Sequence, residues 1–343
     1  MPSRPATIYD VAALAKLSIA TVSRVLQGTG PVSEKARLKV AEAARELNYV
    51  PLRAARSLAV HRHEAHGLVL PDLAGPFYGD LLMGYERWAG ERGQSVIITV
   101  THGRSDEAGR ALRELAGRVD GIVVHGNALN LDAVKGLRQA GVPVVLLAHP
   151  PVSGCDSVRT ESAGSAEKLT RRLLASGRKD LVFVGDPNSG YDVAERYKGF
   201  SAAHRKRDLP APKPEQLPLT EEAGAAMAEH WLTLKSRPDG LVCANDELAL
   251  AAIKTLQAKG IGVPGEVVVT GWDDVMAARY VSPGLTTVRQ PMAELGRLAA
   301  QRLHERITGE RNRTRNDVLA TQIVLRTSCG TQPGESEASN EET

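Results

Sequence analysis

The sequence is poor in the residues that form disulfide frameworks, zinc sites and membrane spans. Only three of its 343 residues are cysteines, and Cys155, Cys243 and Cys329 form no C-x-x-C pair. This spacing favours buried or free thiols in a reducing compartment over disulfides or a zinc site. No apolar run approaches the roughly 18 residues of a membrane helix, and the first ten residues lack the apolar stretch of a secretory signal. We therefore expect a cytoplasmic protein with no membrane segment.

The sequence also lacks the common motifs of catalysis. It contains no G-x-S-x-G nucleophile elbow, no G-x-x-x-x-G-K-[ST] phosphate loop and no H-E-x-x-H metal motif. Residues 260–265 match G-x-G-x-x-G, but they follow a predicted helix and precede a predicted strand, the reverse of a dinucleotide-binding turn. His61, His63 and His66 lack the ligand partners of a metal site, which favours a solvated linker. We expect no enzymatic activity, cofactor or metal.

Positive and negative charges are separated along the chain. Residues 1–62 carry ten Lys and Arg against four Asp and Glu, although the net charge of the whole chain is only +3. Residues 331–343 carry four Glu and no basic residue. A small basic head on a nearly neutral body is the charge distribution of a compact DNA-binding domain. The polar, acidic tail at 331–343 is predicted to be disordered.

Residues 7–28 have the pattern of two short helices joined by a tight turn. Thr7 and Asp10 match the capping box of a helix start, and Ser18 is placed to cap the second helix. The outer positions of this second helix are mostly small or polar. These features predict a helix-turn-helix, in which residues 19–26 enter the major groove of DNA. An ordinary antiparallel helix pair is the alternative.

Two further helical segments follow this motif. A third helix is expected from its cap, Ser33, to about Leu47, and Asn48 is a plausible stop. Residues 52–60, LRAARSLAV, favour a helix but are shorter than the ~12 residues that an isolated helix needs in water. We expect this segment to be ordered only against a partner.

From residue 67 onward, apolar strand-like runs alternate with amphipathic helices. Buried apolar strands separated by helices are typical of parallel sheets covered on both faces, so the body is predicted to be an α/β structure. Two consecutive groups of these strand–helix units, at about 67–155 and 160–285, predict two similar lobes. The expected helices cover residues 77–92, 105–117, 130–140, 162–176, 193–207, 247–259 and 291–308.

These patterns divide the chain into a head, a hinge, a body and a tail. The head covers residues 1–50, and the hinge helix with its linker covers 51–62. The body covers 63–330, with one lobe at about 63–157 and 290–320 and the other at about 158–287 and 321–330. The tail covers 331–343.

Chemically versatile residues follow several of the predicted strands. Ligands of open parallel sheets bind beyond the carboxyl ends of the strands. Aromatic rings there can cover the apolar face of a sugar, while carboxylate, amide and guanidinium groups bind its hydroxyls. Asp246 belongs to this group, although a helix-capping role is its alternative. The other strand-end candidates are Phe77, Tyr78, His125, Asn127, His149, Tyr191, Asp192, Arg196, Asn245, Trp272, Asp273 and Asp274.

Several stretches of the chain, taken in order, carry a resemblance to a known family. They are YDVAALAKLSIATVSRVLQG and VSEKARLKVAEAARELNYVP in the head, and VLPDLAGPFYGDLLMG, DGIVV, ERYKGF, CANDELALAAI and TGWDDVMAARYVSPGLTTVRQP in the body. Together, over about residues 7–329, they resemble the lac repressor/galactose repressor (LacI/GalR) family of bacterial transcription regulators. The resemblance implies an all-α helix-turn-helix head and two doubly wound parallel-sheet lobes of the periplasmic-binding-protein type.

The resemblance also implies a function. It points to a homodimeric, ligand-responsive repressor that binds a pseudopalindromic DNA operator and is switched by a small effector in the cleft between the lobes. A sugar is the first expectation for this effector, and a nucleoside or purine is the second. A solute-binding protein or an enzyme with the same α/β body is the alternative. The dimer face is expected to include Leu81, Leu82 and Tyr85, with lobe core as their alternative role.

The resemblance also implies individual site residues, which we assign by their positions in the matching stretches. The DNA-binding residues implied are Thr7, Tyr9, Ser18, Ile19, Ala20, Thr21, Ser23, Arg24, Asn48, Arg53, Ala55 and Leu58. The effector-binding residues implied are Phe77, Tyr78, His125, Glu161, Tyr191, Asp192, Arg196, Asn245, Trp272, Asp273 and Gln290. Leu58 would wedge into the minor groove. Leu52 stands where the family usually has Asn, while Ala148, Glu161–Ser162 and Leu219 also depart from common family residues.

Overall fold

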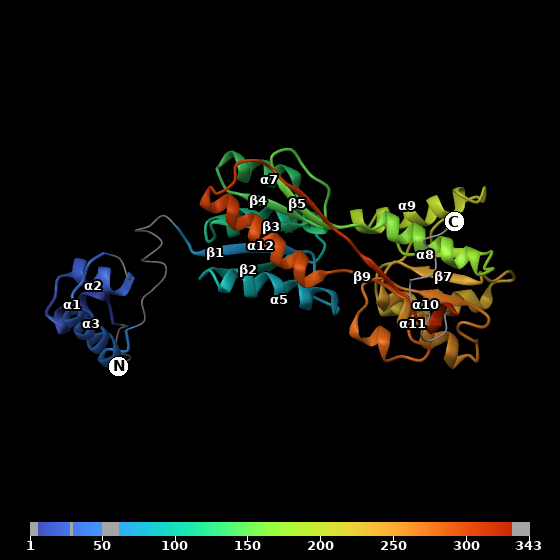
Figure 1. Ribbon diagram of the computed structural model, residues 1–343, viewed down its shortest axis with the longest axis horizontal. Helices are drawn as coiled ribbons and strands as arrows, with labels where there is room; N and C mark the ends of the chain where they lie inside the picture. The colour runs from blue at the N-terminus through green and yellow to red at the C-terminus, as the bar shows by residue number, and fades with distance from the viewer. Residues whose placement is uncertain (1–5, 28–29, 50–61, 331–343) are drawn as a thin grey trace, which may run out of the picture. The chain divides into compact units, whose positions relative to one another are not determined.

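The computed structural model describes residues 6–27, 30–49 and 62–330, which fall into two units. The first unit extends to His63 and the second begins at Glu64 (Figure 1). The segment at 52–60 and the tail at 331–343 lie outside the described residues. Within the described parts, no helix is long and apolar enough to cross a bilayer. The three cysteines are buried thiols, as expected.

The first unit contains three helices, α1 (Ile8–Ala15), α2 (Ile19–Gln27) and α3 (Glu34–Glu46). The predicted capping box is present, because Thr7 accepts a hydrogen bond from the Asp10 amide and the Asp10 carboxylate accepts one from the Thr7 amide. Lys16 ends α1 in the left-handed conformation. Val11, Val22 and Val40, one from each helix, are fully buried in the core of the unit.

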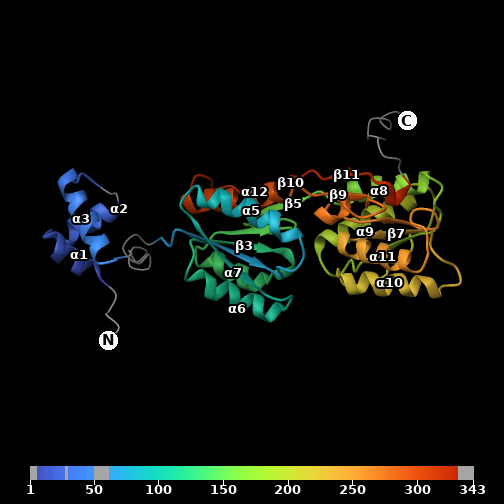
Figure 2. The same ribbon diagram turned by 90° about the horizontal axis from the view of Figure 1, so that it is seen from below.

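The second unit begins with a six-stranded sheet in which every pair is parallel. Its order is β10-β5-β4-β3-β1-β2. Its strands are β1 (Ala65–Leu70), β2 (Ser95–Val100), β3 (Gly121–His125), β4 (Val144–Leu147), β5 (Asp156–Thr160) and β10 (Asn316–Leu319). One face packs on α5 (Phe77–Gly90) and α12 (Met292–Thr308), and the other on α6 (Ser105–Ala116) and α7 (Leu131–Gln139), as Figure 2 shows.

A second parallel sheet has the order β6-β7-β8, with β6 (Leu181–Val184), β7 (Gly240–Cys243) and β8 (Val268–Thr270). Helices α8 (Ala163–Ala175) and α9 (Tyr191–Arg205) lie on one side, and α10 (Glu221–Thr233) and α11 (Asp246–Ala258) on the other (Figure 2). Sequence analysis missed α10. Thr220 caps this helix, and Met227 and Trp231 bury its inner face.

Three chain crossings connect the two sheets. They follow β5, β9 (Thr287–Arg289) and β10, and the strands β9 and β11 (Gln322–Val324) pair antiparallel beside the second sheet. The amide of Glu161 donates to the carbonyl of Leu319, which joins two of the crossings. The last elements of the chain return to the first lobe, because α12 covers the first sheet and β10 extends it.

Helices α5 and α12 pack at very close range, which corrects the dimer-face prediction. Leu81 and Tyr85 are fully buried in this packing, so they belong to the core of the first lobe. A Cβ added at Gly84 would collide with the backbone of Ala293. By contrast, a Cβ at Gly79 on the same helix would meet nothing within 4 Å.

These two glycines give a matched test of the α5–α12 contact. We expect Gly84→Ala to lower the free energy of unfolding by roughly 1–3 kcal/mol, because the clash is with backbone that cannot rotate away. Gly79→Ala should be neutral or raise stability by about 0.5–1 kcal/mol, since alanine is the better helix former. Urea denaturation measures both changes, and equal stabilities of the two variants would contradict the packing.

His66 is a fully buried histidine near the start of β1, which corrects the prediction that it lies in a solvated linker. Its Nδ1 lies 3.3 Å from the Tyr85 hydroxyl, and its ring lies 5.9 Å from that of His304. Burial, followed by His304, lowers the pKa of His66 to about 4, against a smaller raising effect of Asp120. His66 is therefore neutral in the folded protein, whereas the unfolded chain binds a proton near pH 6.5.

This lowered pKa makes stability fall as the pH drops from about 6.5 towards about 4. We expect His66→Asn to lose about 2 kcal/mol less stability than the wild type between pH 7 and pH 5, because asparagine cannot take up the proton. Urea titrations at the two pH values measure this difference. An identical pH dependence of the two proteins would show that His66 is not the titrating group.

Candidate functional sites

Helix α2 presents five of the twelve residues that the sequence assigns to DNA. Ile19, Ala20 and Arg24 are exposed, and Ala20 and Arg24 lie on the side of the helix away from Val22, which is buried. The Nε of Arg24 donates to the carbonyl of Ala20 at 3.3 Å, which lays the guanidinium along the helix surface. A small-residue face with one arginine has the dimensions and chemistry of a recognition helix for the major groove.

The remaining DNA candidates have different surroundings. Tyr9, Ser18 and Asn48 are exposed, whereas Thr21 and Ser23 are half-buried. The hydroxyl of Thr7 is engaged in the α1 cap. Arg53, Ala55 and Leu58 lie outside the described residues.

In the first lobe, aromatic rings gather where α5 begins and β3 ends. Tyr78 packs edge-on to Phe77 with ring centroids 5.1 Å apart and lies 6.4 Å from the ring of His125. The Nδ1 of His125 accepts a hydrogen bond from the amide of Asn127. Burial, and to a smaller extent His149, lowers the pKa of His125 to about 4, so this imidazole is neutral.

In the second lobe, an arginine and two carboxylates lie at the strand ends. The guanidinium of Arg196 stacks over the Trp272 ring at 4.7 Å and donates to the carbonyl of Ala244. Asp273 has a φ of 116°, a region that favours glycine, and its carboxylate accepts a hydrogen bond from Gln290 at 2.7 Å. Burial raises the pKa of Asp273 to about 7 and that of Asp192 to about 6, and nearby Arg196 partly opposes both shifts.

Several buried polar atoms of this group have no hydrogen-bond partner among the described residues. They include Oδ1 of Asp192, Nε of Arg196 and Nε1 of Trp272. An unpaired buried polar atom costs roughly 1–3 kcal/mol, so a cluster of them is the mark of a site completed by a ligand or water. The three atoms offer one acceptor and two donors, which suits a hydroxyl-rich molecule.

The strand ends of the two sheets face each other. The ring of Tyr191, from the second lobe, lies 6.3 Å from that of His149, from the first. A Cβ added at Gly190 would collide with the amide group of Asn127. The predicted aromatic and charged candidates therefore belong to one cluster that draws on both lobes. No group of three or more His, Cys, Asp or Glu in the described chain could hold a metal ion.

Comparison with known proteins identifies the family. A model of the lacI family of bacterial regulatory proteins matches residues 7–51, and a periplasmic binding protein-like domain matches residues 170–329. The "HTH-type transcriptional repressor PurR" of Photobacterium profundum is 30% identical over 328 residues, which are 94% of this chain and 98% of that protein. This chain belongs to the LacI family.

Solved structures of the LacI family agree over the whole described chain. The Lac repressor dimer bound to operator and the anti-inducer ONPF is 26% identical with a TM-score of 0.83, covering 95% of this chain and 99% of that one. The complex of the transcriptional regulator CelR with cellobiose is 31% identical with a TM-score of 0.71, covering 94% and 99%. The predicted helix-turn-helix head and periplasmic-binding-protein type of body are confirmed.

Two expected effector residues of this LacI-family chain serve as helix caps. The Oδ1 of Asn245 accepts from the amide of Leu248, and its Nδ2 donates to the carbonyl of Leu219. The carboxylate of Glu161 accepts from the amides at the start of α8. These hydrogen bonds use the side chains that the sequence assigned to the ligand. Their role is to position the loops around the site.

Asp246 does not cap α11, which corrects the alternative role considered for it. Asn245 is the cap, and the buried carboxylate of Asp246 accepts from the hydroxyl of Thr287 and the amide of Val275. Asp246 thereby fastens the loop that carries Asp273 to β9.

The structure adds one residue that sequence reasoning missed. Arg159, near the end of β5, lies 5.7 Å from the Tyr191 ring, and its positive charge acts on Asp192. The sequence contained a signal for Arg159, because a charged residue there interrupts a buried strand just before the chain crosses between the lobes.

Proposed function

We propose that this LacI-family chain is a dimeric transcriptional repressor whose head binds a pseudopalindromic operator and whose body binds a small effector. The observation that carries the effector part is the cluster of unpaired buried polar atoms around Arg196. The observation that carries the DNA part is the exposed face of α2 on a basic head. A protein whose partner is operator DNA works in the bacterial cytoplasm.

The DNA-reading chemistry follows from the three exposed side chains of α2. Arg24 can donate two hydrogen bonds to a guanine edge, and Ile19 and Ala20 can contact thymine methyl groups. Ser18 and Tyr9 supply hydroxyls for phosphate oxygens. These assignments make Ile19, Ala20 and Arg24 the main determinants of the operator sequence.

The effector chemistry favours a carbohydrate. Tyr78 and Trp272 offer flat apolar surfaces, while Asp192, Arg196 and Asp273 offer acceptors and donors for vicinal hydroxyls. A related regulator, CelR, has been solved with cellobiose. No nucleophile-and-base pair accompanies these groups in the site that we describe, and the relatives are regulators, so we assign the site to binding without turnover.

Gln290 connects the effector cluster to the chain crossings. Its Nε2 donates to Asp273, and its Oε1 accepts from the hydroxyl of Thr160 at 2.6 Å. Thr160 ends β5, so a ligand that engages Asp273 acts on two of the crossings through one amide group. Because effector and operator affinities are linked, each ligand changes the affinity for the other by the same factor.

The dimer face must differ from the buried residues predicted for it. Met83 on α5 and Ile98 on β2 are exposed apolar side chains of the first lobe, and Met276 and Tyr280 are exposed in the second. Large exposed side chains of this kind are typical of protein interfaces. The solved Lac repressor neighbour is a dimer, which supports a homodimer here.

A thermal-shift screen tests the switch directly. We expect one of a set of neutral sugars, including cellobiose and ribose, to raise the melting temperature of the full-length protein, because a ligand that binds only the folded state stabilises it. The same sugar should change the affinity for a duplex that the protein selects from a random library. A set of nucleosides provides the comparison. If no compound changed both stability and DNA affinity, the proposed switch would be wrong.

The raised pKa of Asp273 predicts a pH dependence of effector binding. A sugar hydroxyl donates to an ionised carboxylate, so affinity should rise several-fold as the pH increases from 6 to 8 through the pKa of about 7. Asp273→Asn should weaken binding and flatten this profile in isothermal titration. Asp208→Asn, at an exposed position, serves as the control. A wild-type profile that stays flat over this range would remove Asp273 from the ligand contacts.

A further inference from the structure

The amino-terminal edge of the six-stranded sheet carries several arginines. Because all its strands are parallel and nearly level, the turns leading into β2, β3, β4 and β10 lie along one edge. Within the described chain these turns are residues 91–94, 117–120, 140–143 and 309–315, and they hold five arginines, no lysine and three acids. One of the acids, Asp120, accepts from the backbone amide of Ala65. The five arginines and three acids of these turns give them a net charge of +2.

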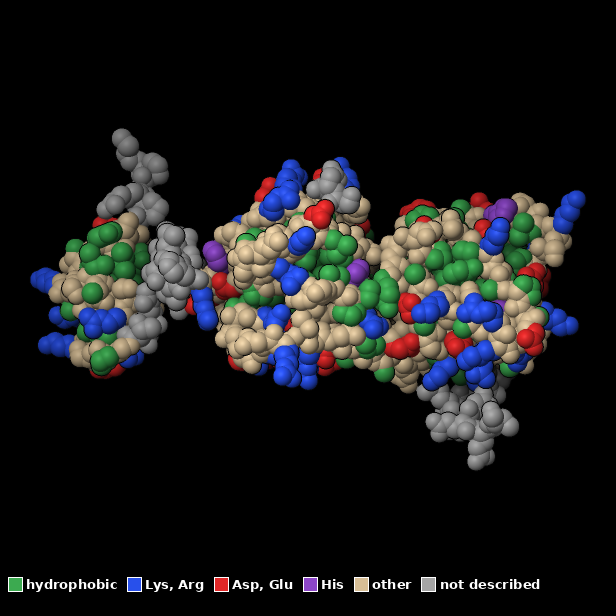
Figure 3. Space-filling view, turned by 90° about the horizontal axis from the view of Figure 1, so that it is seen from above, with side chains coloured by type: hydrophobic (Ala, Val, Ile, Leu, Met, Phe, Trp, Pro, Cys, Tyr) green, Lys and Arg blue, Asp and Glu red, His purple; other side chains and the backbone are tan. Residues whose placement is uncertain are grey.

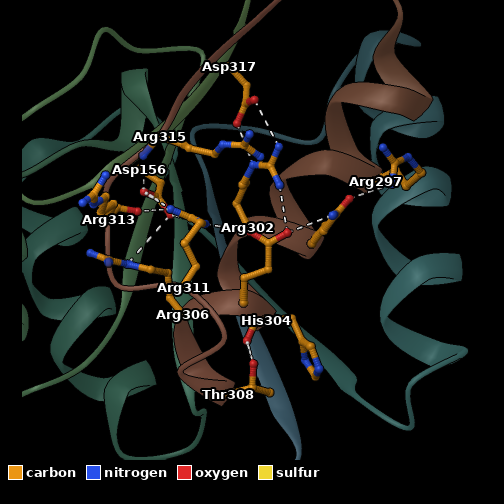
Figure 4. A network of polar contacts seen from close by, with 12 residues as sticks. Asp156, Arg297, Arg302, His304, Arg306, Thr308, Arg311, Arg313, Arg315 and Asp317 are labelled. Carbon is orange, nitrogen blue, oxygen red and sulfur yellow. Dashed lines mark hydrogen bonds and ion pairs between the residues drawn. The ribbon is translucent and has the colours of Figure 1, made fainter.

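An ion-pair network holds the turn at 309–315 in place (Figure 4). Arg311 pairs with the fully buried Asp156 and with Glu305. The backbone amide of Arg315 donates to Asp156, and the carbonyl of Arg313 accepts from Arg311. The buried acids thus neutralise Arg311, and the backbone of the next residues is tied to the same carboxylate.

Arg313 and Arg315 are left exposed on this ordered turn. Arg118 is exposed on the same edge, before β3. Cations near helix ends often complement the helix dipole, which accounts for Arg138 and Arg306 in the last turns of α7 and α12. Arg313 and Arg315 precede a strand, so this explanation does not apply to them. A set made only of arginine suits bidentate contacts to phosphate.

The same edge is where the chain enters the body. β1 starts at Ala65, which pairs with Ser95 at the start of β2. The next residue of β1, His66, pairs with Gly121 at the start of β3. The connection from Tyr49 of the head to Arg62 can span at most ~45 Å, whatever its conformation. The head, with any DNA that it holds, is therefore joined to the body at this edge.

We propose that Arg118, Arg313 and Arg315 form a second, sequence-independent contact to the phosphates of the DNA that flanks the site read by the head. The contact extends the footprint of the protein beyond the helix-turn-helix and adds to affinity without adding to sequence preference. It rests on the proposed DNA binding by the head.

The test compares two DNA lengths with the full-length protein. The short probe is a duplex of about 20 base pairs that the wild type selects from a random library, and the long probe adds about one helical turn of arbitrary sequence at each end. The variant is Arg118→Ser/Arg313→Ser/Arg315→Ser. The control, Lys168→Ser/Arg171→Ser/Arg205→Ser, removes the same charge from exposed positions on α8 and α9. Figure 3 shows that Lys and Arg side chains are scattered over the surface of the body.

We expect the edge variant to bind the long probe roughly tenfold more weakly than the wild type and to keep wild-type affinity for the short one. The slope of log K against log salt on the long probe should become shallower by ~0.9 for each phosphate that the variant no longer neutralises. The control variant should match the wild type on both probes. Arg313→Lys in an otherwise wild-type chain should lose part of the affinity for the long probe, because lysine keeps the charge but cannot make the bidentate contact.

Other outcomes would overturn the proposal. Equal losses of affinity on both probes would show a defect of the head or the fold, and unchanged binding to the long probe would show that the edge does not touch DNA. A similar loss of affinity in the control variant would show that the loss comes from the change of net charge alone and not from the position of the arginines. If the wild type selected no duplex at all, DNA binding by the head would itself be refuted, which is a separate result.

Discussion

The parallel direction of every strand in the two main sheets is the constraint on which the other features depend. In a parallel sheet the amino and carboxyl ends of the strands lie on opposite edges, so each sheet has two chemically distinct edges. The carboxyl edges carry the rings and charges around Arg196 and Tyr78, and the amino edge of the first sheet carries the arginines and the chain entry. The proposed ligand contacts and the proposed second DNA contact therefore lie on different edges of the sheets.

The ligand site is held by groups that do not themselves need a ligand. Asp274 pairs with Arg289 and Arg326, and Asp246 with Thr287, so two buried carboxylates fasten the loop of Asp273 to the crossing strands. This support explains how Asp273 keeps a backbone conformation that is costly for a residue with a side chain. The unpaired atoms of Asp192, Arg196 and Trp272 are the part of the proposed site that an effector would complete.

Much of the architecture was predictable because it depends on local patterns. The capping box at Thr7, the cap at Ser33 and the alternation of strands and helices are encoded in residues close together in the chain. Helix α10 was missed because its alanine-rich sequence has a weak apolar pattern, and only packing of Met227 and Trp231 on the second sheet reveals its buried face.

The candidate site was predictable as a group but not residue by residue. The rule that ligands bind beyond the carboxyl ends of strands selected Tyr78, Arg196 and Asp273. It also selected Asn245, whose side chain is used as a helix cap, and it gave no means of telling the two roles apart.

The sequence by itself determined the kind of protein: a basic helix-turn-helix head on an α/β body with ligand-binding strand ends. These conclusions need only local spacing, composition and the order of elements. The tertiary structure decided which side chains are exposed to a ligand or a partner. It buried Leu81 and Tyr85 under α12 instead of leaving them for a partner, and it ordered the turn of Arg313 around Asp156, 157 residues earlier in the chain. The physical reason is that burial and pairing depend on neighbours distant in sequence, which no local pattern records.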